Sequence, residues 1–238
     1  MRLLVSAASA ADAAAALDGG AAIIDAKNPW AGPLGPVPFD VFRAIVAAVG
    51  GRRPVTAAIG DAVAPASVEA DARMFASLGA SLVKVGFAGA RDHAAVKALA
   101  DAAVSGARSG GAGVVLVAYA DRLHESVSPA TLLDVASSAW AAGVLLDTAD
   151  KRGPRLTELV SPAWLATWVQ LAHRRSLTVA LAGRLQTVDL PIVRQCGADV
   201  AGVRGAACTG GREGVVEVAR VRALLDACTA APDLATQP

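Results

Sequence analysis

The sequence predicts an α/β fold built from eight repeated strand–helix units. Short runs rich in β-branched and apolar residues alternate with Ala-rich stretches of helical length, the pattern of parallel strands joined by helices. The chain has 238 residues and shows no linker or composition break. No G-x-G-x-x-G motif follows the first apolar run, so an open doubly wound sheet is the weaker alternative. We therefore predict a single TIM-type (β/α)8 barrel over residues 1–229, with a disordered tail at 230–238.

The strands are predicted where apolar and β-branched residues cluster between turn-forming residues. In order along the chain they span residues 3–6, 22–26, 55–59, 82–86, 113–119, 143–147, 177–182 and 200–204. The helices that follow them span residues 8–17, 38–49, 67–78, 91–105, 129–141, 162–174, 189–195 and 215–227. Eight evenly spaced units favour closure of the sheet into a barrel.

Local motifs predict several helix ends. Ser128-Pro129 and Ser161-Pro162 are typical of an N-cap residue followed by proline in the first helical position. Glycines end the helical stretches in "LDGGAAII", "SLGASLV", "WAAGVLL" and "QCGADVAGV". We expect these glycines just past the helix ends, before the next strand begins.

Composition and charge exclude several classes of partner. The 22 basic and 21 acidic residues give a net charge of +1 and are scattered, which argues against nucleic acid and anionic membranes. No apolar run reaches the roughly 18 to 20 residues of a membrane-spanning helix, and the apolar part of "MRLLVSAASA" is too short for a signal peptide. Cys196, Cys208 and Cys228 form no C-x-x-C pair, which predicts reduced thiols, a cytoplasmic location and no metal site. We expect no cofactor.

Ionisable residues gather at the carboxyl ends of the predicted strands, where TIM barrels carry their chemistry. Three of the four lysines lie there. The candidate catalytic residues are Asp25, Lys27, Lys84, Asp121, Asp147 and Lys151. Asp25 and Lys27 are two residues apart, so both side chains should project to the same face of the sheet. Lys84 interrupts the apolar run "SLVKVGF", and we therefore expect it to point into the barrel.

Two lysines close together predict a specific chemistry. An amine attacks a carbonyl only when it is unprotonated, and burial beside a second ammonium lowers its pKa toward neutrality. Lys27 and Lys84 could depress each other in this way, with Asp25 orienting one of them or moving protons. This predicts imine chemistry, or proton transfer next to a carbonyl. The alternative for any one pair is a strand-end salt bridge, for example between Asp25 and Lys84.

The last two predicted units carry glycine-rich segments next to arginines. The segments "ALAGRLQTVDLP" and "AGVRGAACTGGREG" follow the strands at 177–182 and 200–204, the usual place of a phosphate site in a barrel. Backbone N–H groups of such turns, together with an arginine, suit a phosphate dianion. The predicted phosphate-binding residues are Gly183, Arg184, Arg204 and Gly205. Trp30 follows the strand at 22–26 and could cover the site or contact another subunit, so a homo-oligomer stays open.

The motifs together resemble those of the (5-formylfuran-3-yl)methyl phosphate synthase family. The resemblance runs nearly from end to end, through "IIDAKNP" with "GPLG", "LVKVGF", "LLDTADK" and "GVRGAAC". It implies an enzyme of methanofuran and methylofuran biosynthesis that joins two molecules of glyceraldehyde 3-phosphate, one reacting as its ketose isomer. The product would be 4-(hydroxymethyl)-2-furancarboxaldehyde phosphate, formed with loss of water and one phosphate.

The resemblance also implies roles for individual residues. Lys27 would be the Schiff-base lysine and Lys84 the proton-transferring residue, while Asp25, Asp147 and Lys151 match further polar positions of the family. The chain departs from the pattern at two positions: Arg152 replaces an acidic residue, and Arg184 replaces a small one. Two alternatives stay open, another class I aldolase-type reaction on sugar phosphates and a barrel that only binds a sugar phosphate.

Overall fold

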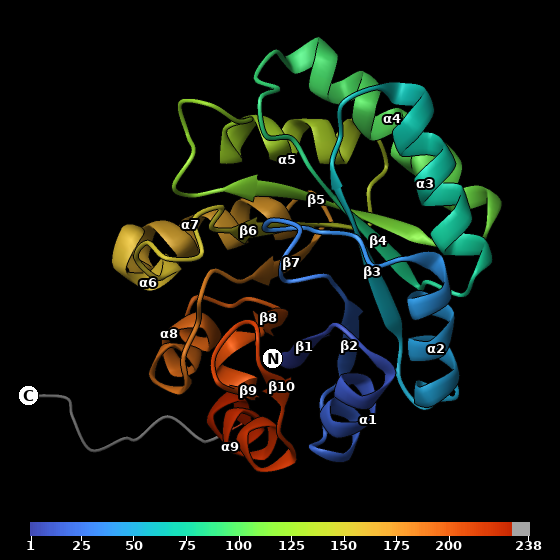
Figure 1. The fold of residues 1–238 in the computed structure, drawn as a ribbon. Helices are drawn as coiled ribbons and strands as arrows, with labels where there is room; N and C mark the ends of the chain where they lie inside the picture. Colours follow the sequence, from blue (N-terminus) through green and yellow to red (C-terminus); the bar gives the residue numbers. More distant parts are fainter. Residues whose placement is uncertain (230–238) are drawn as a thin grey trace, which may run out of the picture.

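A computed structural model describes residues 1–229 of the chain. The tail at 230–238, which the sequence predicts to be disordered, lies outside the described residues. Eight parallel strands form a closed barrel in the order of the sequence, with β8 pairing back to β1, so the predicted fold class is confirmed (Figure 1). The strands are β1 (Arg2–Ala7), β2 (Ile23–Ala26), β3 (Val55–Asp61), β4 (Leu82–Gly86), β5 (Gly113–Tyr119), β6 (Gly143–Asp147), β7 (Thr178–Leu181) and β8 (Val200–Val203).

Helices surround the barrel and cover the outer face of its strands (Figure 1). They are α1 (Ala10–Asp18), α2 (Phe39–Val49), α3 (Pro65–Ser77), α4 (His93–Ser109), α5 (Pro129–Ser138), α6 (Leu156–Leu159), α7 (Pro162–His173), α8 (Leu190–Gln195) and α9 (Val218–Thr229). The short α6 and the 3-10 turns η1 (Thr187–Asp189) and η2 (Gly205–Ala207) were not predicted. The predicted helix at 215–227 begins too early, because Val215 and Val216 form strand β10 and pair with β9 (Cys208–Thr209).

The predicted helix ends are mostly confirmed. Ser128 accepts a hydrogen bond from the N–H of Thr131, and Ser161 accepts one from the N–H of Trp164, so both serines cap their helices. Gly20, Gly79 and Gly197 all have positive φ angles.

The prediction for "WAAGVLL" is wrong. Trp140, with φ of 59°, takes the left-handed conformation after α5, and Gly143 is the first residue of β6. A Cβ at Gly143 would overlap the backbone of Thr178 on the neighbouring strand, so this glycine allows close strand packing.

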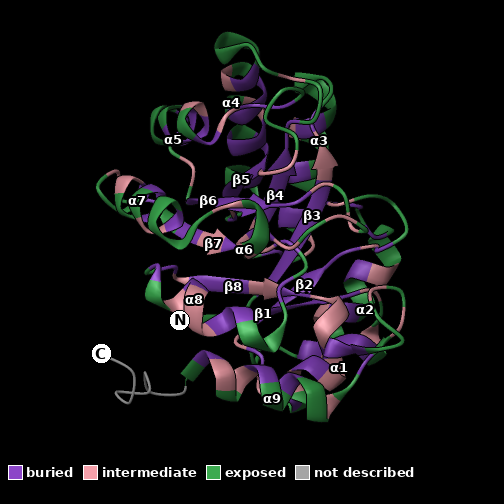
Figure 2. Cartoon of the chain, turned by 90° about the vertical axis from the view of Figure 1, so that its left-hand side faces the viewer, coloured by how far each residue is buried: buried purple, intermediate pink, exposed green. Residues whose placement is uncertain are grey.

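Side-chain alternation along the strands separates two layers of core. Ile24 and Ala26 of β2 pack outward in the main core, which also contains Phe42 and Ile45 of α2. Inside the barrel, smaller apolar clusters such as Leu4, Ile23 and Val200 fill its floor. Figure 2 shows the resulting distribution, with buried strands and helices that are exposed on their outer sides.

The register of the first three strands sets up the site. Ser6 of β1 lies opposite Asp25 of β2, and Asp25 lies opposite Thr56 of β3. Because neighbours in a parallel register point to the same face, the three polar side chains meet inside the barrel. Within residues 1–229, no helix is long and apolar enough to cross a membrane.

Substitution of Gly106 tests how closely the outer helices α3 and α4 pack. This residue lies inside α4, and a Cβ there would overlap the backbone carbonyl of Glu69 on α3. Gly106→Ala should therefore lower the free energy of unfolding by about 1–3 kcal/mol through overpacking. Helix propensity alone predicts the opposite sign, a gain of up to about 1 kcal/mol. Urea denaturation followed by circular dichroism distinguishes the two, and a stabilised variant would contradict this helix contact.

Candidate active site

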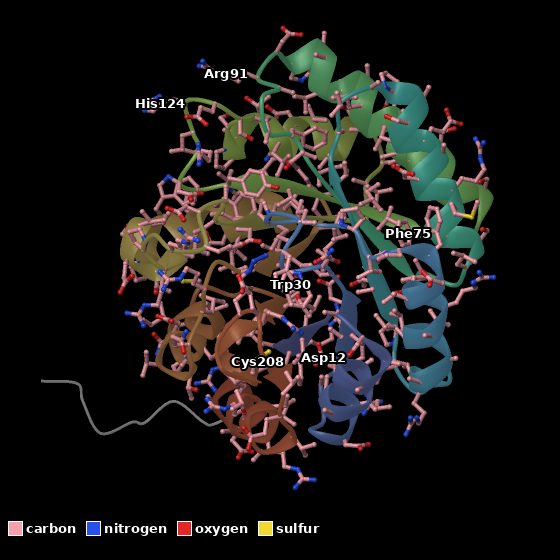
Figure 3. All side chains as sticks on the ribbon, viewed as in Figure 1. Asp12, Trp30, Phe75, Arg91, His124 and Cys208 are labelled. Atoms are coloured by element: carbon pink, nitrogen blue, oxygen red, sulfur yellow. The ribbon has the colours of Figure 1, made fainter. Side chains whose placement is uncertain are left out.

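A cavity of about 420 Å³ opens at the carboxyl ends of the barrel strands. One side is polar and contains Lys27, Lys84, Asp147 and Lys151. The floor is apolar, and the remaining rim comes from the segments that follow β7 and β8. Apolar floor residues include Leu4, Leu145, Ala180 and Val200. In Figure 3, Trp30 is labelled near the middle of the barrel in this view, in the loop between β2 and α2.

Asp25 is fully buried and holds Lys84. Its carboxylate accepts hydrogen bonds from Ser6 Oγ at 3.0 Å and Thr56 Oγ1 at 2.7 Å, and it lies 2.6 Å from the Nζ of Lys84. The strand register described above places Ser6 and Thr56 beside Asp25, and Lys84 reaches the carboxylate from β4, two strands away. The salt bridge considered as the alternative for this pair is therefore present, with Lys84 only 7% exposed. The carboxylate of Asp25 and the amine of Lys84 thus neutralise each other, and Lys84 still lines the cavity.

Asp147, at the end of β6, holds a second lysine. One of its oxygens accepts hydrogen bonds from Lys151 Nζ and from the N–H of Thr148, both at 2.7 Å. Burial alone would raise the pKa of Asp147, but the positive charges of Lys151 and Lys27 and these hydrogen bonds hold it below the ordinary value. Lys151 also donates to the carbonyl of Thr148. Asp147 is therefore a fixed negative charge.

Lys27 is the cavity lysine whose amine is least committed to a partner. Its Nζ lies 3.8 Å from Asp147, whereas the amines of Lys84 and Lys151 lie within 2.7 Å of their carboxylates. Burial lowers the pKa of Lys27 to about 7, assisted by the charges of Lys151 and Lys84 and opposed by Asp147 and Asp25. An amine with this pKa is neutral in about half of the molecules at pH 7, so it can act as a nucleophile.

The predicted lysine pair thus acts with a third cation. The prediction attributed the depressed pKa of Lys27 to burial together with the charge of Lys84. In the structure burial is the largest cause, followed among the cations by Lys151 and then Lys84. Lys84 and Lys151 each have a carboxylate in direct contact, so their charges are compensated while that of Lys27 is not.

Asp121 does not join this group. Its two oxygens accept hydrogen bonds from the N–H groups of Ala149 and Asp150, each at 2.7 Å. These residues lie between Asp147 and Lys151, so Asp121 fixes the loop that presents Lys151. Asp121 is not among the residues that line the cavity, so its contacts support a positioning role, and its place in the catalytic group stays a prediction.

Arg204 lines the cavity but is already bonded to the protein. Its guanidinium donates to the carbonyls of Ser6, Arg212 and Gly214 at 2.8–3.0 Å and to Asp12 at 2.7 Å. These bonds occupy four of the five N–H donors of an arginine. Arg204 therefore joins several segments at this end of the barrel. One N–H donor remains for phosphate, and the phosphate-binding role of Arg204 stays a prediction. Figure 3 labels Asp12, the carboxylate of this buried pair.

The other predicted phosphate residues do line the cavity. Gly183, Arg184 and Gly205 contribute to its rim, and both Gly183 and Arg184 have positive φ angles. A Cβ at Gly183 would meet the side chain of Thr148 at 2.9 Å. The turn therefore needs a glycine, both for its positive φ angle and for this close contact. Arg184 is exposed, and no ion pair of its side chain is formed with the described residues.

Sequence reasoning missed Arg212. This residue follows Gly210 and Gly211, lines the cavity, and donates hydrogen bonds to the carbonyls of Pro29 and Gly32 at 2.9 and 2.8 Å. The phosphate-site pattern "CTGGREG" contained this arginine, but nothing in the sequence indicated that it would reach the segment after β2.

Comparison with known proteins assigns a family to this arrangement. The model of the family described as 4-HFC-P synthase matches residues 3–225. A (5-formylfuran-3-yl)methyl phosphate synthase from Methanopyrus kandleri is 38% identical over 232 residues, which cover 95% of this chain and 98% of the relative. A synthase of the same name from Methanococcus maripaludis is 35% identical, over 96% of this chain and 99% of the relative.

Solved structures support the fold. A 3-hexulose-6-phosphate synthase from Salmonella typhimurium superposes with a TM-score of 0.67 at 18% identity, over 95% of this chain and all of that one. A structure of KGPDC from Streptococcus mutans gives a TM-score of 0.69 at 14% identity, over 95% and 96% of the two chains. At such low identity these matches concern the barrel alone.

The bonds of Arg204 predict a large effect on stability. Arg204→Ala leaves Asp12 buried without its cation, so the free energy of unfolding should fall by about 3–5 kcal/mol. The matched control is Arg220→Ala, because Arg220 also lines the cavity but forms an exposed pair with Glu217. Its effect should stay within about 0.5 kcal/mol. Urea denaturation measures both, and equal stability of the two variants would show that the Arg204–Asp12 pair does not stabilise this end of the barrel.

The depressed pKa of Lys27 predicts its reactivity. The rate at which an amine-selective reagent labels Lys27 should rise with pH around a midpoint of about 7, because only the neutral amine reacts. In Asp147→Asn the midpoint should move lower, since Asp147 favours the charged amine. Mass spectrometry of the labelled peptide gives both profiles. A midpoint near 10 in the unmodified chain would show that the amine is not desolvated as described.

Proposed function

We propose that this chain, which belongs to the 4-HFC-P synthase family, condenses two molecules of glyceraldehyde 3-phosphate into 4-(hydroxymethyl)-2-furancarboxaldehyde phosphate. This product is the (5-formylfuran-3-yl)methyl phosphate for which the relatives are named. The observation that carries the proposal is the buried amine of Lys27, with a pKa of about 7, between two lysine–carboxylate pairs.

The first step is formation of an imine at Lys27. The neutral amine attacks the carbonyl carbon of one triose phosphate, and the carbonyl oxygen leaves as water after two proton transfers. The ammonium of Lys151, bonded to Asp147, can donate a proton to the departing oxygen. Burial supports this step twice, since it lowers the pKa of the amine and keeps bulk water away from the imine.

The second step needs a proton acceptor beside the imine. Removing a proton from the neighbouring carbon gives an enamine, whose electron pair expels the phosphate from the third carbon and leaves an enol. The third carbon of this enol then attacks the ketone carbon of the second triose phosphate, which reacts as its ketose isomer. We assign the proton transfers to the pair of Lys84 and Asp25, since both are buried within the barrel and Lys84 lines the same cavity as Lys27. Ser6 and Thr56 keep the Asp25 carboxylate in one orientation.

Ring closure completes the product. The two trioses supply all six carbons, and elimination of one phosphate and two waters leaves the aromatic furan aldehyde phosphate, with no net oxidation or reduction. Hydrolysis of the imine releases Lys27. We assign a retained phosphate to the rim of Gly183, Arg184 and Gly205, where Arg184 has no ion pair within the described residues.

A product assay tests this function. The purified chain incubated with glyceraldehyde 3-phosphate should form an ultraviolet-absorbing furan aldehyde together with one equivalent of inorganic phosphate. Lys27→Arg keeps a cation but cannot form an imine, so its turnover should fall at least about a hundredfold. Lys97→Arg is the matched control, because Lys97 pairs with Asp101 on the outer face of α4, and it should keep normal activity. Furan formation by Lys27→Arg at the normal rate would refute the imine assignment, and absence of furan in the unmodified chain would refute the function.

A further inference from the structure

Arg212 ties two segments of the cavity rim together. It lies in the segment between β9 and β10, and its guanidinium bonds to the carbonyls of Pro29 and Gly32 between β2 and α2. This β2–α2 loop begins with Lys27 and carries Trp30, which is 64% exposed. The backbone N–H of Asn28 bonds to the carbonyl of Gly35 at 2.8 Å, so the loop is closed at its base. Arg212 therefore contacts the tip of a closed loop that starts at the reactive lysine.

The backbone of Arg212 is itself held firmly. Arg204 donates from Nε to the carbonyl of Arg212 at 3.0 Å and from Nη2 to that of Gly214. Arg204 is anchored in turn by the buried carboxylate of Asp12. The side chain of Arg212 thus projects from a fixed base toward a loop held by two hydrogen bonds.

The charge of Arg212 has no carboxylate partner within the described residues. An arginine has five N–H donors, and only two of those of Arg212 are used by Pro29 and Gly32. Burial lowers the pKa of Arg212, because desolvation disfavours the charged guanidinium. Neutral donors would suffice to bond two carbonyls, so a partly buried cation on a cavity rim indicates a further, anionic partner.

We propose that Arg212 binds the phosphate of a triose phosphate with its remaining donors while it holds the β2–α2 loop, and so couples phosphate binding to the position of that loop beside Lys27. This inference rests on the proposed function for its ligand. It assigns a phosphate contact separate from Arg184, which follows β7 and makes no bond to this loop in the described structure. A reaction that joins two phosphorylated substrates needs contacts for two phosphates, and the rim offers a cation in each of two segments.

Inorganic phosphate is the probe that tests this proposal. Its affinity is measured by calorimetry at constant ionic strength on the full chain, and fluorescence is recorded in the same titration. Arg212→Ala should weaken phosphate binding at least tenfold. The phosphate-dependent fluorescence change should come from Trp30, so it should vanish in Trp30→Phe and in Arg212→Ala. Arg212→Lys should recover part of the affinity without the fluorescence change, because an ammonium lacks the planar fork that holds two carbonyls.

Arg220→Ala is the matched control, since it removes the same charge from the same cavity but from a residue already paired with Glu217. It should change phosphate affinity by less than twofold. If Arg212→Ala and Arg220→Ala lost the same phosphate affinity, the loss would reflect only the removal of a positive charge from the cavity, and the proposal would be overturned. Unchanged affinity in Arg212→Ala, absence of phosphate binding by the unmodified chain, or a Trp30 response that survives without Arg212 would also overturn it. None of these measurements involves turnover, so the furan assay can fail or succeed independently of them.

Discussion

The site depends on one electrostatic constraint, the presence of two buried lysines and a half-buried third with only two carboxylates in direct contact. Asp25 compensates Lys84 and Asp147 compensates Lys151, which leaves the amine of Lys27 desolvated and 3.8 Å from the nearest carboxylate. Removing a charge from water is costly, so burial lowers the pKa of Lys27 to about 7 and makes its proton easier to remove than that of an exposed lysine. The two lysine–carboxylate pairs beside Lys27 are placed to move protons around it. Nucleophile and proton donors therefore arise from a single charge arrangement.

The barrel supplies this arrangement through strand register. Alternation along β2 sends Asp25 inward and Ile24 outward, and pairing with β1 and β3 places Ser6 and Thr56 beside the carboxylate. Beyond the strand ends, long-range bonds fix the connecting segments: Asp121 holds the loop that carries Lys151, and Arg204 joins α1 to the segments after β8. The rigid strands and these bonded loops together hold the lysines and carboxylates of the site in one geometry, as catalysis requires.

Most of the fold and half of the site follow from sequence patterns, because both depend on local periodicity. Apolar runs located all eight strands, and the two-residue spacing of Asp25 and Lys27 placed both at the barrel mouth. Contacts between distant residues could not be predicted in this way. Arg204 occupies a typical phosphate-site position and also bonds to Asp12 on α1, and Asp121 accepts hydrogen bonds from backbone N–H groups of the next loop. Arg212 was overlooked for the same reason, since its partners Pro29 and Gly32 lie at the other end of the chain.

Reductive trapping tests the central claim most directly. The chain is mixed with glyceraldehyde 3-phosphate and borohydride, digested, and analysed by mass spectrometry for a reduced triose adduct. The account predicts that the adduct lies on Lys27, because this amine alone among the cavity lysines has no carboxylate within hydrogen-bond distance in the described structure. An adduct confined to Lys84 or Lys151, or no adduct under conditions where the furan product forms, would contradict it.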